Sequence, residues 1–150
     1  MKDIFTKEIT DEVIGRINLL NSETQPVWGK MSVGQMLAHV AVTYKYIYDN
    51  TYKKPKGFKA FLVKKLIKPM VTNEKPYKKN GMTSPDYKIT TQKDFEKEKN
   101  QLIDYLKRTQ ELGGEHFEKI ESHSFGMLTK NEWNNMFYKH LDHHLTQFGV

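Results

Sequence analysis

The sequence predicts a single all-α domain, a four-helix bundle with a long, irregular, lysine-rich connection between its second and third helices. Apolar residues recur at helical spacing in four stretches of the 150-residue chain, and two of these stretches begin with a capping box. No stretch shows a clear strand-period alternation. The chain is long enough for one domain with its own core but too short for two ordinary ones, so we expect residues 1–150 to form one unit.

The first helix is predicted by an apolar face over residues 10–20, and residues 21–26 interrupt that periodicity. A second helix is predicted to start after Ser32, because Gln35 three residues later completes a capping box. Its apolar face is formed by Val33, Met36, Val40, Tyr44 and Ile47. This face predicts that the second helix runs to about Asn50.

The connection that follows carries most of the chain's prolines and its positive charge. Four of the five prolines lie between residues 52 and 90. Residues 53–79 contain ten lysines and one acidic residue, Glu74, which gives a local charge of +9 against +6 for the whole chain. Residues 58–68 predict a short basic amphipathic helix. The remainder predicts a loop long enough to line or cover a functional site.

The lysine-rich segment bears on the kind of partner to expect. Nucleic-acid sites usually mix arginine and aromatic residues, whereas Arg16 and Arg108 are the only arginines in this chain. We therefore expect a solvated surface and no nucleic-acid partner. An anionic small molecule, a membrane surface and RNA are the alternatives for this segment.

The last two helices have clear end signals. Thr91 and Asp94 both resemble a cap for the third helix, and Gly113-Gly114 predicts its end. Thr129 with Glu132 forms a second capping box, which predicts a fourth helix over residues 130–147. The aromatic residues Trp28, Tyr44 and Phe137 are expected to belong to the core and not to contact a ligand.

Composition excludes several kinds of function. The chain has no cysteine, so disulfides, cysteine-ligated zinc, iron–sulfur clusters and a protein thiol nucleophile are all excluded. No run of eighteen apolar residues predicts a transmembrane helix, and residues 1–5 lack the apolar stretch of a secretory signal. These features predict a cytoplasmic protein, and they limit any metal site to histidine, carboxylate and water ligands.

Two histidines on the fourth helix are the strongest functional signal. His140 and His144 lie four residues apart, so a rotation of roughly 40° separates them and both rings leave the same helix face. The apolar residues of that face are Trp133, Met136, Phe137, Leu141 and Phe148. Two titratable rings within an apolar face are costly to bury without a partner, and a metal ion would be such a partner. Hydrogen-bonded core histidines are the alternative interpretation.

A third ligand has to come from another part of the fold. His39 is the strongest candidate, because it is the only histidine on another core-forming helix. His143 lies about 100° around the helix from His144 and cannot easily share an ion with both neighbours. His116 follows the predicted end of the third helix, and His123 lies in a loop. Three histidines would leave positions open for water or substrate, which is the pattern of a catalytic site.

Gln35 and Gln147 are candidates to hydrogen-bond the ring N–H groups of the ligand histidines, although capping and surface roles fit them equally. His123 and His143 are further candidates for lining the pocket.

Two motifs resemble a known family. Residues 28–39, WGKMSVGQMLAH, resemble the second-helix signature of the DinB-like superfamily, and residues 140–149, HLDHHLTQFG, resemble its closing HxxxH motif with a downstream glutamine. The HxFG motif at His123 and the Glu132-Trp133 pair resemble one uncharacterised branch of that superfamily. The resemblance implies a single DinB-like four-helix-bundle domain, usually dimeric. It also implies a divalent metal held by His39, His140 and His144.

Characterised relatives of that superfamily include S-transferases and an isomerase that use low-molecular-weight thiols, and others are described as metal-dependent hydrolases. We expect a metal-dependent transferase that acts on a small-molecule substrate with such a thiol. A metal-dependent hydrolase, a metal- or small-ligand-binding bundle without catalysis and a basic interaction module are the alternatives. Three histidines accept zinc, nickel, iron, manganese or cobalt, so the sequence does not identify the metal.

Overall fold

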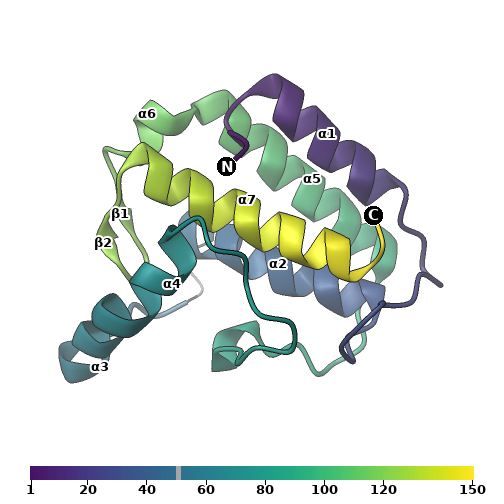
Figure 1. The fold of residues 1–150 in the computed structure, drawn as a ribbon, viewed down its shortest axis with the longest axis horizontal. Helices are drawn as coiled ribbons and strands as arrows, with labels where there is room; N and C mark the ends of the chain where they lie inside the picture. The colour runs from purple at the N-terminus through teal and green to yellow at the C-terminus, as the bar shows by residue number, and fades with distance from the viewer. Residues whose placement is uncertain (50–51) are drawn as a thin grey trace.

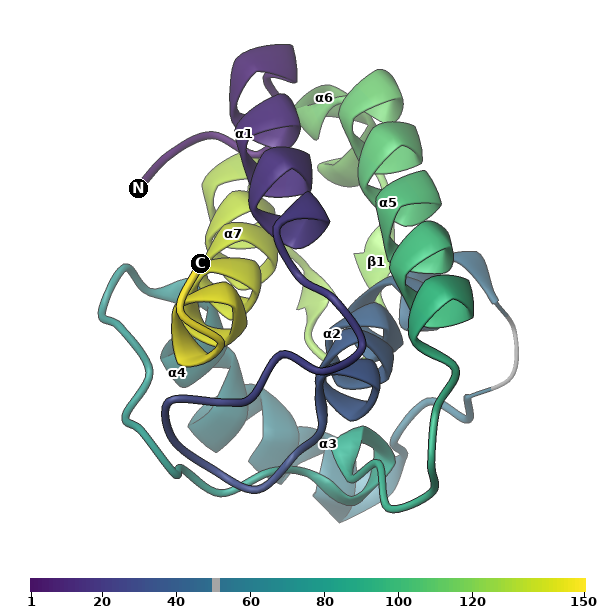
Figure 2. The ribbon, with the colours of Figure 1, turned by 90° about the vertical axis from the view of Figure 1, so that its right-hand side faces the viewer.

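The computed structural model describes residues 1–49 and 52–150, and the chain is mostly helical across them. Among these residues four long helices form the body of the molecule: α1 (Lys7–Asn18), α2 (Val33–Tyr48), α5 (Phe95–Leu112) and α7 (Lys130–Gln147). Helices α1 and α2 each pack against both α5 and α7. Figure 1 shows α7 crossing the front of the molecule, and Figure 2 shows the four helices grouped around a common interior. The prediction of a helical fold is confirmed.

The ends of the long helices follow their capping residues. Both predicted capping boxes are present, at the start of α2 and at the start of α7. Helix α5 begins after Asp94, whose carboxylate accepts the backbone N–H of Lys97 at 2.7 Å, so Asp94 and not Thr91 is its cap. Gly113 ends α5 with φ = 70°, a conformation that glycine adopts without strain.

The core between the helices is rich in aromatic side chains. Tyr44 of α2 stacks on Phe137 of α7 with 5.1 Å between ring centroids. Phe137 also packs against Trp133 at 5.5 Å and against Phe117 at 5.4 Å. All four side chains are almost fully buried. This cluster fixes α7 against α2, the two helices that carry the candidate metal ligands.

Three short features differ from the prediction. Helix α1 begins at Lys7 instead of about residue 10, because the side chain of Thr6 accepts the backbone N–H of Ile9 and caps it. The short helix α6 (Gly114–Phe117) follows α5. Strands β1 (Glu121–Ser122) and β2 (Gly126–Met127) then form an antiparallel hairpin before α7, with Glu121 opposite Met127. Strands of two residues are too short to produce a recognisable alternation.

The connection between α2 and α5 is more ordered than predicted. Residues 57–72 form one helical run made of α3 (Gly57–Leu62), a π-helical turn (Val63–Ile67) and α4 (Lys68–Thr72). The prediction of a short helix over residues 58–68 is confirmed and extended, and the prediction that the rest is irregular is wrong for residues 69–72. The continuation of the helical run beyond residue 68 was not predicted because proline usually interrupts a helix, whereas Pro69 is tolerated here in the first turn of α4.

Two side chains of α7 hold the end of this run against the helical body. The ammonium group of Lys139 donates to the carbonyl oxygens of Met70 and Asn73, and the amide of Asn135 donates to the carbonyl oxygen of Thr72. These groups satisfy carbonyls that the helix end leaves without partners. Further along, a 3-10 turn (Pro85–Tyr87) packs against α2 and brings this connection to the candidate site.

Candidate metal centre

Helices α2 and α7 bring His39, His140 and His144 together. One nitrogen from each ring lies within 4.8 Å of the corresponding nitrogen of the other two. The ring centroids are 4.5 to 5.0 Å apart. His39 and His144 are buried and His140 is half-buried. The three histidines selected from the sequence therefore lie close enough to bind one metal ion, and we refer to them as the histidine triad.

The rings of His39 and His144 are oriented through Nδ1. The Nδ1–H group of His39 donates to the carbonyl oxygen of Tyr87 at 2.7 Å. Nδ1 of His144 lies 2.7 Å from Oε1 of Gln147, whose Nε2 group donates to the carbonyl oxygen of Trp28. Because both partners accept, each histidine carries its proton on Nδ1 and keeps a free lone pair on Nε2. This arrangement is typical of metal-binding histidines.

The third ring is held through a hydroxyl pair. Nδ1 of His140 lies 3.0 Å from Oγ1 of Thr43, and that oxygen lies 3.1 Å from the hydroxyl of Tyr87. Thr43 follows His39 by four residues, so both project from the same face of α2. Tyr87 therefore supports two ligands of the triad, His39 through its backbone and His140 through its hydroxyl by way of Thr43.

The distance between two facing nitrogens tests whether the triad fits a metal. Nε2 of His39 lies 3.0 Å from Nε2 of His140. Two imidazole nitrogens on one tetrahedral ion, each at about 2.0–2.1 Å from it, lie roughly 3.3 Å apart. Two nitrogen lone pairs at 3.0 Å repel each other unless a proton or a metal cation lies between them. The donor set and its spacing fit a divalent transition metal.

Residues 28 and 29 lock Gln147 in place. Trp28 supplies the carbonyl that fixes the Gln147 amide. Gly29 has φ = 89°, and a Cβ atom at this position would lie 2.4 Å from Nε2 of Gln147. A side chain at position 29 would therefore strain the backbone and displace the glutamine. The prediction that the Trp28 ring belongs to the core is wrong: it is half-buried, with the Lys79 ammonium 4.3 Å from its centroid.

Burial keeps the triad neutral. It lowers the pKa of His144 to about 3, and the neighbouring His39 ring adds to this effect. Burial is also the main cause of the lowered pKa of His39, which the hydrogen bond to Tyr87 opposes. The pKa of His140 lies well below its usual value for the same reason, with His144 contributing. Neutral imidazole is the form that binds a metal.

These shifts predict that the metal-free protein loses stability in mild acid. Below about pH 6.5 the unfolded histidines take up protons, whereas the folded triad resists them. The free energy of unfolding should therefore fall by up to about 1.4 kcal/mol per pH unit for each such histidine between roughly pH 6.5 and 5. Urea unfolding of chelator-treated protein across this range measures the slope.

Two controls separate this effect from general acid sensitivity. His116→Gln removes an exposed histidine outside the triad and serves as the reference for the triad variant. The His144→Gln variant should reduce the pH slope. Equal slopes in the wild type and in His144→Gln would contradict the burial argument.

The other nominated residues lie at different distances from the triad. Gln147 contacts it directly. The His143 ring lies 5.6 Å from the Tyr77 ring and 6.0 Å from the Trp28 ring, at the edge of the site. Gln35 completes the cap of α2 and donates to the carbonyl oxygen of Thr91, and none of these hydrogen bonds reaches the triad.

His123 lies in a separate polar cluster. Its ring stacks on Tyr46 at 4.1 Å, and its nitrogens hydrogen-bond the Ser124 hydroxyl and the Tyr52 carbonyl. The Tyr46 ring contacts the Tyr87 ring edge-on at 5.6 Å. His123 is therefore linked to the triad through two intervening tyrosines, Tyr46 and Tyr87.

Sequence reasoning missed Thr43, Tyr77 and Tyr87. Thr43 had a signal, since it lies one helical turn after His39. Tyr87 holds His39 through its main-chain oxygen, which no sequence pattern identifies. The Tyr77 ring packs edge-on against the His140 ring at 6.4 Å. Both tyrosines come from the segment between α2 and α5, which agrees with the expectation that this segment covers the site.

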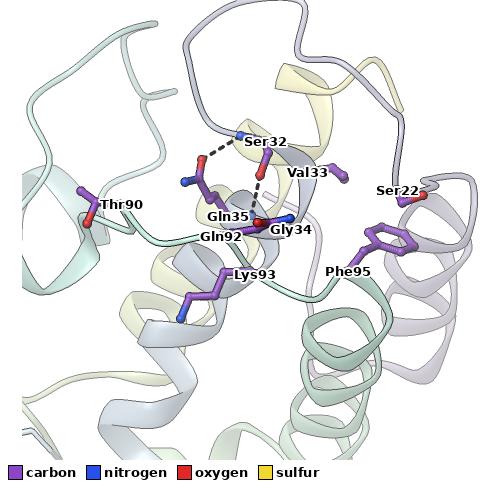
Figure 3. Close-up of a pocket in the computed structure, with 9 residues that line it drawn as sticks. All are labelled: Ser22, Ser32, Val33, Gly34, Gln35, Thr90, Gln92, Lys93 and Phe95. Carbon is purple, nitrogen blue, oxygen red and sulfur yellow. Dashed lines mark hydrogen bonds between the residues drawn. The ribbon is translucent and has the colours of Figure 1, made fainter.

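A cavity lies at the start of α2, apart from the triad. It has a volume of about 590 Å³ and is lined by Gln35 with residues from the loop before α5. Figure 3 shows it, with the paired hydrogen bonds between Ser32 and Gln35 at its wall. Gly34 permits the close approach of the two segments here, because a Cβ atom would lie 2.9 Å from the carbonyl oxygen of Lys93. The cavity contains no histidine.

The helical fold and the histidine triad together define a class of protein, namely a mostly helical chain with a candidate three-histidine metal site between two of its helices. Within that class the chain belongs to the family described as "Protein of unknown function (DUF1569)", whose family model matches residues 4–149. No curated protein and no solved structure shows significant similarity to the chain.

Proposed function

We propose that the histidine triad binds a divalent transition metal and that the chain is a metal-dependent transferase acting with a low-molecular-weight thiol. The observation that carries the proposal is the orientation of the triad, in which Nδ1 of each ring has a polar partner and Nε2 of His39 faces Nε2 of His140. Three protein ligands leave further coordination positions for a substrate, as in catalytic metal sites. A bound divalent metal would lower the pKa of a coordinated thiol and hold it as thiolate.

The surroundings of the triad favour a thiol over water as the nucleophile. Among residues 1–49 and 52–150, no carboxylate joins the three histidines in a metal-binding group. Thr43, Tyr87 and Gln147 contact the rings instead, and none of them is a strong base at neutral pH. A thiol with a pKa of about 8.5 needs only a modest shift to ionise at pH 7, whereas water needs the full shift of roughly nine units that a metal such as zinc can supply. This comparison favours thiol transfer over hydrolysis.

Two tyrosines would shape the approach of the substrate. Burial raises the pKa of Tyr77 and of Tyr87 above the usual value, so both remain neutral hydroxyls at physiological pH. Their rings pack beside the His140 ring, with centroids 6.4 and 5.7 Å from its own. A neutral, partly buried wall of this kind strengthens the electrostatic effect of a bound cation on its substrate.

The experiment is a transfer assay with metal-loaded protein, glutathione or cysteine as the thiol and chlorodinitrobenzene as a generic electrophile. The carbon–sulfur bond forms, the carbon–chlorine bond breaks, chloride leaves with the electron pair, and the thiol proton passes to the solvent. We expect turnover that requires added metal and falls to the uncatalysed rate in His144→Ala. Turnover that is equal in wild type and His144→Ala would refute the proposal.

Control variants keep this assay interpretable. His116→Ala should retain full activity, because His116 is exposed and does not belong to the triad. A positive metal-binding result combined with inactivity against a broad panel of thiols and electrophiles would refute the transferase and leave a metal-binding protein without that activity.

We further propose that the four long helices form a bundle of the DinB-like type. Support comes from contacts between the two resembling motifs: the Trp28 carbonyl of the first holds Gln147 of the second, and His39 meets His140. The homodimer and the cytoplasmic location belong to the same proposal. Sedimentation equilibrium tests the dimer.

A further inference from the structure

Residues 53–70 form an exposed segment that is both basic and apolar, which we call the basic arm. It contains α3, the π-helical turn and the first residues of α4. The Phe58 side chain is 74% exposed and the Leu66 side chain is 62% exposed. Its other exposed large apolar residues are Phe61, Leu62, Ile67 and Met70. Six such residues within thirteen positions make an apolar patch on a helical element, and patches of this kind mark interaction surfaces.

The basic arm projects from the helical body. Helix α4 packs against α7, whereas α3 makes its main contacts with the π-helical turn that follows it. Figure 1 shows α3 at the outer end of this run, beyond the ends of the neighbouring helices. The arm is therefore anchored on α7 through α4, and Ala60 and Lys64 line a small pocket with the hairpin, while the exposed phenylalanines of α3 face away from the long helices. Packing inside the described domain does not account for the exposed phenylalanines.

All the charged side chains of the basic arm are positive. Residues 53–70 contain seven lysines and no acidic residue, while the chain outside residues 53–79 has a net charge of −3. Lys68 pairs with Glu132 at 3.0 Å. No other lysine of the arm has a carboxylate partner among residues 1–49 and 52–150. The Lys65 ammonium lies 5.8 Å from the centroid of the Phe61 ring, so charged and apolar groups share the same side.

We infer that the basic arm docks on a membrane surface that contains anionic lipids. A helix with phenylalanine and leucine on one side and lysines around it lies in the interface, with its apolar groups below the headgroups and its ammonium groups among them. The mildly acidic remainder of the chain would orient the arm toward such a surface. Among the described residues the structure contains no helix suited by length and apolarity to cross a bilayer, so the arm lies on the membrane.

Charge complementarity decides between this surface and other occupants. A two-fold dimer through the arm would place seven lysines against the same seven lysines, which is unfavourable without intervening acids. A nucleic acid would match the charge but would leave the apolar side chains of Phe58, Leu62 and Leu66 without a partner. An anionic bilayer satisfies both properties of the arm.

The test is sedimentation of the full chain with vesicles of phosphatidylcholine alone or with about 30% phosphatidylserine. We expect binding to the anionic vesicles that weakens with salt. Phe58→Ser/Phe61→Ser should weaken it by roughly a hundredfold, at about tenfold for each ring. Lys59→Gln/Lys65→Gln should weaken it by roughly twenty-fivefold, at about fivefold for each lysine. All four side chains are exposed, so these variants should fold.

Matched controls use equally exposed residues elsewhere. Leu19 at the end of α1 is 71% exposed, and Leu19→Ser should bind vesicles normally. Lys97→Gln/Lys107→Gln on α5 should do the same. The inference is independent of metal binding, so His140→Ala/His144→Ala should also bind normally.

Three outcomes would overturn the inference. One is the absence of binding to anionic vesicles at low salt. Another is binding that Phe58→Ser/Phe61→Ser leaves intact, which would show electrostatic adhesion alone. The third is a dimer that the same phenylalanine variant dissociates while vesicle binding persists, which would make the arm a self-association surface.

Discussion

Substituting both His140 and His144 with alanine is expected to abolish bound transition metal, from about one equivalent per chain to none. The two residues supply two of the three candidate nitrogen ligands, and His39 alone cannot hold an ion against water and buffer. Elemental analysis of protein purified without a metal-affinity tag measures this directly. Because a bound ion stabilises the folded state, metal should also raise the melting temperature of the wild type and leave that of the double variant unchanged.

Histidines outside the triad provide the comparison. His116→Ala/His123→Ala removes the same number of imidazoles, yet neither residue belongs to the metal-binding group, so occupancy should stay at about one equivalent. No metal in the wild type, even after reconstitution with zinc, nickel or manganese, would refute the site and with it the proposed enzyme. Equal occupancy in wild type and in the triad variant would place the metal elsewhere.

The long helices and the triad could be predicted because their signals are local. Capping boxes fix the first residues of α2 and α7 through hydrogen bonds within four residues of sequence. The spacing of His140 and His144 fixes a common helix face, and the apolar residues around them indicate that this face is buried. His39 could then be predicted as the third ligand, because it is the only histidine on another core-forming helix and that helix was expected to pack against this face.

The supports of the triad could not be predicted, because they depend on how distant segments meet. The Tyr87 carbonyl reaches His39 across 48 residues, and the Trp28 carbonyl reaches Gln147 across 119. Main-chain groups leave no trace in a sequence pattern. The same limit applies to the basic arm: its lysines and apolar residues predicted a short helix, but only the fold shows that α3 lacks a neighbouring long helix.

Gln147→Leu is expected to weaken metal affinity by about 10- to 100-fold while leaving one binding site per chain. Leucine has about the same volume as glutamine but cannot accept a hydrogen bond from the Nδ1–H group of His144. The ring therefore loses the contact that fixes its orientation. Competition with a chromophoric chelator measures the affinity. Gln147→Glu should keep it close to the wild-type value, because a carboxylate accepts the same proton.

Gln35 is the matched control, since the sequence nominates both glutamines and the structure separates them. Gln35→Leu removes the reciprocal hydrogen bond that caps α2, and it should cost about 1 kcal/mol of stability without changing metal affinity beyond about twofold. A large loss of affinity in Gln35→Leu, or none in Gln147→Leu, would show that helix capping and not the hydrogen bond to His144 controls the site. A loss of stability without a loss of affinity in Gln35→Leu, together with a loss of affinity in Gln147→Leu, would assign Gln147 the role of positioning the His144 ring.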